Sequence, residues 1–488
     1  MANKSQKRIL IVGAGEAGIM ALDEIQHHSE LNSEIIGFID DDPEKLGKYL
    51  KNVKVLGNRE KLPEIIYEND IHEVLIAMPS AEGGVIRSTI NVCQNCKTDF
   101  KIVPCLWEII NGNFNINQIR QVNENDLLGR ETAEIDKKDI IDIIKGKKVM
   151  VTGGGGSIGS ELCRQVARNK PESIIIFSRG ENSLYNIGVE LNHYFPELSI
   201  DLVVGNVEDS NKVEHCIRKN KPDIIFHAAA HKHVPFMEKD PDEAIKTNVF
   251  GTKNLAESAI KWGVEKFVLI STDKAINPTS VMGASKRIAE MIIQHFSDMQ
   301  NQTKFMAVRF GNVIGSRGSV VPFFKKQIEY GGPVTVTHPD VLRYFMTIPE
   351  AVQLIQQAVT IGNGGEVFVL DMGDPIRIVD LARNLIVLSG FIPEQDIKII
   401  FTGLRPGEKL FEEPLSKRED VSATKKDKIY ISNLMKVNDN FTKDLDELQQ
   451  IIYIDDTDSL IRKLMEIVPT YKPNREAKKI NKLWMCFD

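Results

Sequence analysis

Two glycine-rich turns constrain the fold of this chain more than any other feature of the sequence. Each turn follows a short apolar segment that predicts a strand, and each opens a stretch with helical periodicity. The first turn is Gly13–Gly18, after the segment 7–12, and the second is Thr152–Gly159, after a segment around Val149. A strand, a glycine turn and a helix begin a βαβ unit, so we expect parallel sheets covered by helices.

Both units continue as alternating strands and helical stretches. After Gly311 the spacing becomes irregular and rich in Gly and Pro, which favours a smaller lobe built over the strand ends. We therefore predict an α/β protein with two tandem Rossmann-like, doubly wound parallel-sheet units, of which the second carries a smaller C-terminal substrate-binding lobe. The further strands are expected at 34–39 and 73–77 in the first unit, and at 174–177, 202–204, 224–227, 267–271 and 306–310 in the second.

The same patterns predict the domain boundaries. The stretch 111–131 is rich in Asn, Gln and Glu and lacks a sustained period, which indicates a connector. The tail beyond about Val421 is charged and is expected to be peripheral. The predicted parts are an N-terminal Rossmann-like domain at 1–110, a linker at 111–146, a second domain at 147–420 with its binding core at about 147–310 and its lobe mainly after 311, and a C-terminal segment at 421–488.

The composition is typical of globular proteins. With 488 residues, 42% of them apolar and 26% charged, the chain is too long for one core. The net charge of −7 gives no electrostatic case for binding nucleic acid. Six cysteines are too few for a disulfide framework and indicate a reducing compartment, so we expect the cytoplasm. Residues 1–8 lack the apolar core of a signal peptide, and no membrane span is expected.

Cys93 and Cys96 have the spacing of a redox or zinc site. No second Cys or His pair follows them at the distance that a zinc site needs. We therefore interpret them as two thiols on a helix, and we expect no metal.

The first glycine turn has the spacing of a dinucleotide fingerprint at Gly13, Gly15 and Gly18. Asp40 ends the next strand, where an acid would bind ribose hydroxyls. Such glycines let a pyrophosphate approach the N–H groups at a helix N-terminus. In the alternative interpretation the turn only packs helix on strand and the acids at 40–42 are solvated. A second nucleotide site and a purely structural turn both stay open.

In the second glycine turn, Gly153, Gly156 and Gly159 are three residues apart, a spacing typical of short-chain dehydrogenases. The strand that follows ends in Ser178 and Arg179, where an acid would hold a ribose hydroxyl. Arg179 can instead accept a 2′-phosphate, or it can point to solvent. NAD and NADP therefore both stay open as cofactors.

Reactive side chains gather after the predicted strand at 266–270. Thr272, Asp273 and Lys274 follow the strand end, where α/β sheets bind their ligands. Met282 and Lys286 follow at a spacing that places them on one helix face, and Met282 stands where short-chain dehydrogenases have a tyrosine. Methionine cannot abstract a proton. The structural alternatives are that Thr272 caps a turn, Asp273 pairs with Lys286, and Met282 fills the core.

These motifs resemble those of the long-type UDP-N-acetylglucosamine 4,6-dehydratases, which belong to the capsule and polysaccharide biosynthesis family within the extended short-chain dehydrogenase/reductase superfamily. The resemblance covers nearly all of the chain. Many long-type members carry membrane helices before the first Rossmann-like unit, whereas this sequence has none, so we expect a natural form without them or a truncated one. Besides Ser-Thr-Asp-Lys and Met-x-x-x-Lys, the family-like stretches are 227–235, 247–249, 309–313, 317–322 and 403–409.

The resemblance implies a lyase that converts UDP-N-acetylglucosamine to UDP-2-acetamido-2,6-dideoxy-xylo-hexos-4-ulose with a retained NAD(P). Carbon 4 is oxidised, water leaves across carbons 5 and 6, and the hydride returns to carbon 6. By resemblance, Asp273 is the acid, Lys274 the carbon 5 base, and Thr272 with Lys286 replaces the tyrosine beside Met282. Lys274 must be neutral to take a proton, so we expect burial or a cationic neighbour such as Lys286 to lower its pKa.

The resemblance also implies the contacts of both ligands. Arginines are expected at the UDP diphosphate because a guanidinium pairs phosphate oxygens in a fork. Contacts to NAD(P) are expected from Gly153, Gly156, Ser157, Ile158, Gly159, Ser178, Arg179, Asn206, Val207, Ala228, Ala229, Ala230, Lys232, Asn248 and Lys286. Contacts to the sugar nucleotide are expected from His233, from Asn312 at the acetamido group, from Arg317, Arg343 and Arg405 at the diphosphate, from Val321 and Pro322 at the uracil, and from Glu408 at the ribose.

The sequence also allows two functions other than a dehydratase. A UDP-hexose 4-epimerase uses the same fold and cofactor, but the missing tyrosine and the Asp273-Lys274 pair argue against it. A non-catalytic nucleotide-binding scaffold would explain Met282 as a sign of lost catalysis. The helices at 252–262 and 282–299 correspond to those that pair subunits in extended short-chain enzymes, so a homodimer or larger homo-oligomer is expected.

Overall fold

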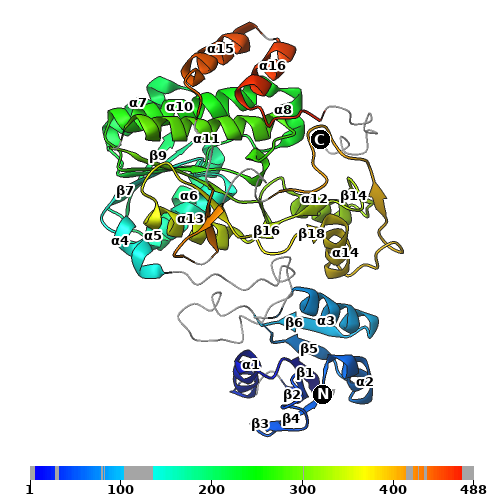
Figure 1. Cartoon of the computed structure of the whole chain (residues 1–488). Coiled ribbons are helices and arrows are strands. Elements are labelled where there is room, and N and C mark those ends of the chain that lie inside the picture. The colour runs from blue at the N-terminus through cyan, green and yellow to red at the C-terminus, as the bar shows by residue number, and fades with distance from the viewer. Residues whose placement is uncertain are drawn as a thin grey trace. The chain divides into compact units, whose positions relative to one another are not determined.

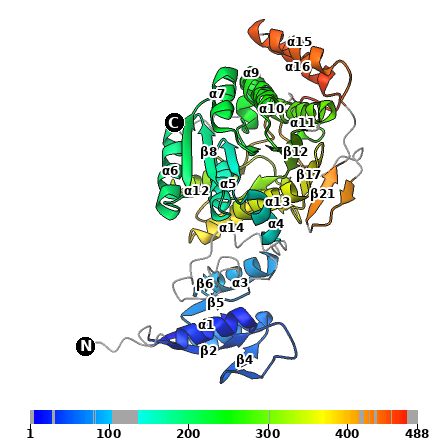
Figure 2. The same cartoon turned by 90° about the vertical axis from the view of Figure 1, so that its left-hand side faces the viewer.

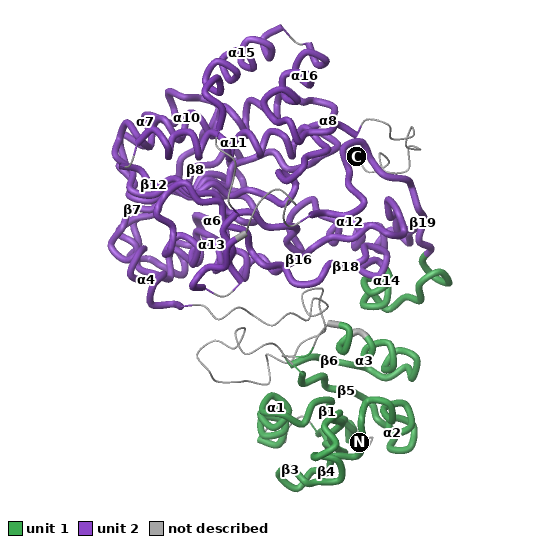
Figure 3. Tube along the Cα trace, in the orientation of Figure 1, with its two compact units in different colours: residues 1–132, 383–397 green, residues 133–382, 398–488 purple. Residues whose placement is uncertain are grey.

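The computed structural model describes residues 6–27, 32–78, 81, 83–103, 136–300, 302–413, 421–426, 428–432, 437–454 and 456–474. Most of the predicted linker at 111–146, and the end of the C-terminal segment, lie outside these residues. The chain separates into two compact units (Figure 3). Unit 1 comprises 1–132 and 383–397, and unit 2 comprises 133–382 and 398–488.

Unit 1 is built on a six-stranded sheet in the order β3-β4-β2-β1-β5-β6. All neighbouring strands are parallel except the β3–β4 hairpin. The chain reverses its direction of strand addition between β1 and β5, which is where doubly wound sheets bind ligands. The elements are β1 (Lys7–Val12), α1 (Glu16–His27), β2 (Ser33–Ile39), β3 (Tyr49–Leu50), β4 (Val53–Gly57), α2 (Leu62–Glu68), β5 (Glu73–Ile76), α3 (Gly83–Asn95) and β6 (Asp99–Ile102).

Unit 2 contains a nine-stranded sheet in the order β20-β21-β17-β12-β11-β10-β7-β8-β9. The seven strands from β17 to β9 are parallel, and β21 and β20 add to the edge in antiparallel fashion. The parallel strands are β7 (Lys148–Thr152), β8 (Ser173–Ser178), β9 (Ser199–Val204), β10 (Ile224–His227), β11 (Lys266–Ile270), β12 (Lys304–Arg309) and β17 (Val367–Leu370).

Helices cover both faces of this sheet, as Figures 1 and 2 show. In β11, Phe267 and Leu269 enter the core on one face, whereas Val268 and Ile270 enter the core on the other, because successive side chains of a strand alternate. Strands buried on both faces explain the nearly unbroken apolar runs in the sequence. The first core is closed by α7 (Ser210–Asn220), α10 (Gly251–Lys261) and α11 (Val281–Met299), and the second by α4 (Lys137–Ile144), α5 (Ser157–Arg168), α6 (Glu181–Tyr194) and α13 (Ile348–Ile361).

Short elements after β12 form the lobe over the strand ends. The strands pair two by two: β13 with β16, β14 with β19, and β15 with β18. The two-unit α/β architecture with a smaller lobe is therefore confirmed. The lobe elements are β13 (Asn312–Val313), α12 (Val320–Glu329), β14 (Val334–Val336), β15 (Leu342–Arg343), β16 (Phe345–Met346), β18 (Ile376–Arg377), the first residues of α14 (Ile378–Leu388) and β19 (Ile399–Phe401).

The C-terminal part of the chain is an integral part of unit 2, which corrects the prediction of a peripheral segment after 421. Strands β20 (Val421–Ala423) and β21 (Ile429–Ser432) extend the main sheet. Helices α15 (Phe441–Ile454) and α16 (Thr457–Ile467) share the core with α11. These helices are rich in charged residues, so composition alone does not reveal that their leucines are buried. Because α15 and α16 pack on α11, part of the helix expected to pair subunits is covered by its own chain.

No helix in the described parts of the chain is long and apolar enough to cross a membrane.

Candidate functional site at the strand ends of unit 2

The second glycine turn joins β7 to α5 and has the geometry of a nucleotide-binding turn. Gly153 has φ +67°, and a Cβ there would lie 2.7 Å from the Ala229 nitrogen. A Cβ on Gly159 would lie 2.2 Å from the Gly153 carbonyl oxygen. The glycines thus let the turn approach the end of β10, and the N–H groups at the start of α5 can bind an anion.

A residue predicted for the cofactor contacts one predicted for the substrate in this region. The Arg317 guanidinium donates to the Gly155 carbonyl oxygen, and Lys232 Nζ donates to the Arg317 carbonyl oxygen at 2.8 Å. Arg317, expected at the UDP diphosphate, therefore lies on the glycine turn. Arg179 is exposed, with its Nη1 3.3 Å from His231 Nε2.

Asn248 has a structural role beside the loop 228–233. It lies in a π-helical stretch (Ile245–Phe250), donates to Ser285 Oγ at 2.9 Å and exchanges hydrogen bonds with the His231 backbone. Its amide thus ties the 228–233 loop to α11.

Of the predicted catalytic residues, Thr272, Asp273, Lys274 and Lys286 make polar contacts, whereas Met282 is a core residue. Thr272 caps a 3₁₀ turn (Asp273–Ala275), and its Oγ1 donates to Asp273 Oδ1 at 2.9 Å. Lys274 Nζ donates to the same Asp273 oxygen at 3.0 Å. Lys286 Nζ donates to the Ile270 carbonyl oxygen at 2.7 Å, and Met282 packs in the core. The capping role of Thr272 and the core position of Met282 are thus present, whereas Asp273 pairs with Lys274 rather than with Lys286.

Burial and charge set the protonation of this group. Burial raises the pKa of Asp273, and the neighbouring carboxylate of Glu412 acts in the same direction. Burial lowers the pKa of Lys286 to about 8, although Glu290 opposes the change. A carboxyl group with a raised pKa and a lysine with a lowered pKa are the kinds of group that acid–base chemistry requires.

The expectation that Lys286 lowers the pKa of Lys274 is wrong. Burial alone would lower the pKa of Lys274, but the carboxylates of Asp273 and Glu412 outweigh it and raise that pKa. Lys286 is directed instead to the Ile270 carbonyl oxygen. In the ligand-free site Lys274 is therefore an ammonium ion between two carboxyl groups.

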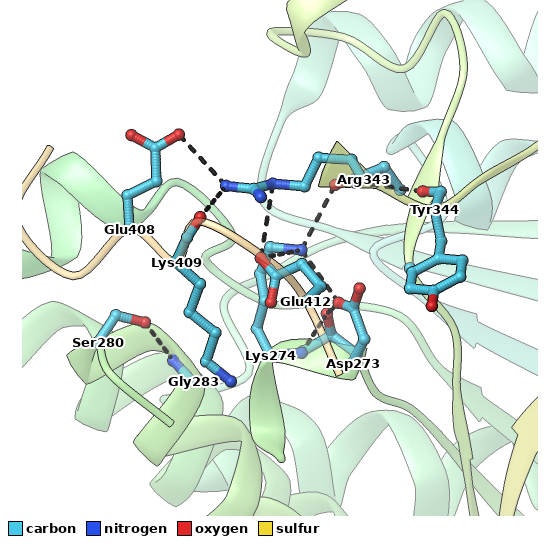
Figure 4. A network of polar contacts seen from close by, with 12 residues as sticks. Asp273, Lys274, Ser280, Gly283, Arg343, Tyr344, Glu408, Lys409 and Glu412 are labelled. Carbon is cyan, nitrogen blue, oxygen red and sulfur yellow. Dashed lines mark hydrogen bonds and ion pairs between the residues drawn. The ribbon is translucent and has the colours of Figure 1, made fainter. Parts of the chain in front are cut away.

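Glu412 was missed by sequence reasoning. Its carboxylate lies 3.4 Å from Lys274 Nζ and 3.6 Å from Arg343 Nε (Figure 4). Glu412 closely follows the family-like stretch 403–409. It is distant from Lys274 in the sequence and lies beside it only because of the fold of the lobe. The sequence places Lys274 beside one aspartate and gives no sign of a second carboxylate, because residue 412 is far away along the chain.

The expected diphosphate and ribose residues are drawn together by the lobe. Arg343 donates to the carbonyl oxygens of Leu342 and Lys409, both at 2.7 Å, and lies 3.3 Å from Glu408 Oε1. Glu408 also accepts from the Arg405 backbone N–H at 3.1 Å. A cavity of about 140 Å³ opens beside them. Its lining is Val234, Pro235, Lys274, Thr279, Ser280, Arg343, Arg405, Gly407, Glu408, Lys409 and Glu412.

The remaining predicted substrate residues lie in nearby segments. Asn312 Oδ1 accepts from Lys274 Nζ at 3.4 Å, so this amide is beside the reactive pair. His233 precedes a helix (Val234–Lys239) and packs against Gly318. Val321 is buried in the first turn of α12, next to Pro322.

The first glycine turn lines a separate cavity of about 530 Å³ in unit 1. Close packing requires glycine at positions 13 and 18, since a Cβ on Gly13 or Gly18 would come within 2.4 Å of a backbone oxygen. A Cβ on Gly15 would meet nothing within 4 Å, and Gly15 lines the cavity. Asp40 accepts from the Ala14 N–H at 2.7 Å, so its carboxylate already lies on the turn. Packing thus explains two of the three glycines but not Gly15.

Cys93 lies in α3, and burial raises the pKa of its thiol to about 12. It is therefore a protonated core side chain. In the described residues, no group of three or more His, Cys, Asp or Glu side chains is arranged to hold a metal ion.

Comparison with protein families gives two matches. A model described as polysaccharide biosynthesis protein matches residues 149–434, and one described as CoA-binding domain matches residues 1–104. The two matches correspond to the two Rossmann-like units.

Individual relatives extend this result. A Bacillus subtilis (strain 168) protein named Probable polysaccharide biosynthesis protein EpsC is 48% identical over 85% of this chain and 69% of its own. A Campylobacter jejuni protein named UDP-N-acetylglucosamine 4,6-dehydratase (inverting) is 35% identical over 55% of this chain and 78% of its own. A Rickettsia canadensis UDP-glucose 4-epimerase is 37% identical over 56% of this chain and 81% of its own.

Among solved structures, Pen from Bacillus thuringiensis is 36% identical, with a TM-score of 0.54, and the match covers 59% of this chain and 87% of that one. Relatives named as a dehydratase and as an epimerase are similar to this chain to nearly the same degree. The choice between the two reactions therefore depends on the residues of the site.

Proposed function

Because the chain belongs to the polysaccharide biosynthesis protein family, we propose that it is a nucleotide-sugar 4,6-dehydratase acting on UDP-N-acetylglucosamine with a retained NAD(P). The family includes nucleotide-sugar dehydratases and epimerases. The product is the 4-keto-6-deoxy sugar with the xylo configuration, in which carbon 5 keeps its configuration.

The observation that carries this proposal is the buried pair of Asp273 and Lys274 at the end of β11. Elimination across carbons 5 and 6 needs a base for the carbon 5 proton and an acid for the departing hydroxyl. One proton transfer along the 3.0 Å hydrogen bond from Lys274 Nζ to Asp273 Oδ1 converts the ion pair into a neutral amine and a protonated carboxyl. Burial favours the neutral forms, so both catalysts arise from one pair.

The second glycine turn fits the pyrophosphate of a dinucleotide. Gly153–Gly156 leave the N-terminus of α5 without bulky side chains, and Ala228–Ala230 lie alongside. When bound, NAD(P) supplies the oxidant for carbon 4 and the reductant for carbon 6. Ser157, Ile158 and Gly159 in the first turn of α5 would hold the pyrophosphate with the glycine turn.

The proton steps are assigned to residues within this cluster. Thr272, with Lys286, accepts the proton of the carbon 4 hydroxyl. Lys274 removes the proton on carbon 5, and Asp273 gives its proton to the carbon 6 hydroxyl, which leaves as water. When the hydride returns to carbon 6, carbon 5 takes a proton back from Lys274, whose protons exchange with solvent. The proton accepted by Thr272 and Lys286 balances the one lost by Asp273, so the residues return to their starting charge.

The buried thioether of Met282 argues against an epimerase. An epimerase returns the hydride to carbon 4 and has no use for an acid and a base at carbons 5 and 6. The cationic side of the cavity, from Lys274, Arg343, Arg405 and Lys409, supports a diphosphate ligand.

The test is incubation of the full chain with UDP-N-acetylglucosamine in deuterated water, followed by proton NMR. We expect a new methyl signal that loses its coupling as deuterium enters carbon 5, together with the signals of a hydrated 4-ketone. UDP-N-acetylgalactosamine without deuterium would identify an epimerase. No change with added NAD or NADP would favour another substrate or a non-catalytic scaffold.

A further inference from the structure

Lys274 lies between two carboxyl groups that come from different parts of unit 2. Its Nζ is 3.0 Å from Asp273 Oδ1, in the adjacent position of the chain, and 3.4 Å from Glu412 Oε1, which the lobe contributes. Figure 4 shows both carboxyl groups directed toward the lysine. Only 3% of the Glu412 side chain is exposed, so its charge acts on Lys274 with little screening by water.

Pairing of the backbone holds Glu412 in place. Phe411 forms a bridge with Leu342, and the Leu342 N–H donates to the Leu410 carbonyl oxygen at 3.2 Å. Arg343, next along β15, reaches Glu412 Oε1 from the other side, at 3.6 Å from its Nε. Glu412 therefore directly follows a residue that is paired with β15, and Arg343 of the same strand contacts its carboxylate, so its position is fixed as a positioning residue requires.

The hydrogen bonding of Glu412 differs from that of a structural ion pair. Buried polar atoms in proteins nearly always have a partner. Within the described residues, Glu412 Oε2 and Asp273 Oδ2 are buried and have none. One unpaired oxygen on each side of the lysine is a cost to stability, and it indicates that the three groups are arranged for function.

We propose that Glu412 is a positioning residue that holds the amine of Lys274 beside Asp273 and retains protons on that pair. The proposal rests on the proposed dehydratase function and deepens it. Glu412 touches no reacting atom in this scheme, because it acts through Lys274.

The direction of its effect follows from charge. The charged groups that face the Asp273–Lys274 pair are Glu412, Arg343 and Lys409, and Lys409 Nζ is bonded to the Ile276 carbonyl oxygen. An anion favours the protonated form of both a carboxyl and an amine. Loss of the Glu412 charge should therefore lower both pKa values of the pair, by about one unit or more, since a charge within about 4–6 Å shifts a pKa by roughly 1–3 units.

The first test needs no turnover. Full-length wild type, Glu412→Gln and Glu413→Gln are treated with acetic anhydride at pH 8, and acetylation of Lys274 is followed by mass spectrometry, with exposed Lys443 as the internal reference. Glu413 is the matched control, because it is the adjacent carboxylate, is exposed, and accepts from Asn277 at 2.8 Å. We expect Lys274 to react about tenfold faster in Glu412→Gln, since one pKa unit is a tenfold change in neutral amine. An unchanged rate would overturn the proposal.

The second test measures kcat against pH with UDP-N-acetylglucosamine. The two pKa values that the Asp273–Lys274 pair contributes to the profile should move to lower pH in Glu412→Gln and stay in place in Glu413→Gln. A step near pH 8 that belongs to Lys286 should stay in place in both variants. A uniform loss of rate with the two pKa values of the pair unmoved would mean a merely structural role and would overturn the proposal. Faster acetylation of Lys274 in Glu412→Gln, together with a wild type that shows no dehydratase activity, would support the positioning of Lys274 and reject the proposed function.

Discussion

The carboxylate of Glu290 holds the guanidinium of Arg309 through two hydrogen bonds of 2.7 Å in the interior of unit 2. Both side chains are at most 1% exposed. Glu290 lies in α11 and Arg309 ends β12, and Ser271 Oγ, one residue before Thr272, donates to the same carboxylate at 2.7 Å. The pair therefore fixes the helix that carries Lys286 against the strand ends that carry the reactive residues.

Removal of Arg309 alone should strongly destabilise unit 2. In Arg309→Met the Glu290 charge stays buried without its main partner, which costs about 3–5 kcal/mol. The double variant Glu290→Met with Arg309→Met should recover much of that loss, because neither charge of the pair remains buried. Urea unfolding of the wild type and these variants measures both effects. Equal losses in the single and double variants would show that packing matters more than charge.

The same pair should make stability fall in acid. Burial raises the pKa of Glu290, but Arg309, Arg287 and Ser271 outweigh it and lower the pKa to about 2, from the usual 4.5. A carboxyl with a lowered pKa stabilises the fold fully above pH 4.5, and this contribution is lost as the pH falls toward 2. The shift corresponds to about 3 kcal/mol. In Glu290→Gln the decline in unfolding free energy between pH 6 and pH 3 should be smaller by about 2 kcal/mol, the part of this contribution that is lost by pH 3.

Titration of Lys286 should produce a step in the pH dependence of kcat near pH 8. Burial lowers its pKa to about 8, and in the proposed mechanism its neutral form takes up the carbon 4 proton with Thr272. The rate should therefore rise as the pH increases through about 8. Lys286→Met should reduce kcat by about 10²–10⁴-fold with little change in KM, and should abolish this step. A step that persists in Lys286→Met would assign it to another group.

The two interpretations of the first glycine turn predict different substitution effects. Gly18→Ala should destabilise unit 1, because the added Cβ would lie 2.0 Å from the Gly13 carbonyl oxygen. Gly15→Val should leave the unfolding of unit 1 unchanged, because it meets open space, but should block a nucleotide. Hydrogen exchange of residues 10–22 with and without NAD or CoA checks this. Protection that appears in the wild type and not in Gly15→Val supports a second site, and no protection in either supports a purely structural turn.

The sequence predicted those parts of the molecule that depend on local patterns. Strands such as β11 are apolar on both faces, and a glycine turn after a strand limits the chain to few conformations, so both were recognisable. The strand end also brought Thr272, Asp273 and Lys274 together without further information. Burial of these groups and the direction of the Lys274 pKa depend on Glu412, which only the return of the lobe brings near. Likewise, β21 carries no strong signal of its own and joins the sheet because β17 offers it a free edge.

One feature of unit 1 affects how the protein can be made. Residues 383–397 belong to this unit, where Val387 and Leu388 pack on its core and the Val387 carbonyl oxygen accepts from Gln94 Nε2 at 2.7 Å. Residues 383–397 are synthesised long after residues 1–132, so unit 1 gains this segment only late in synthesis. During synthesis, the apolar surface that Val387 and Leu388 will cover is open to other partners, such as chaperones. A gene fragment that ends at residue 132 encodes this unit without the piece that closes it.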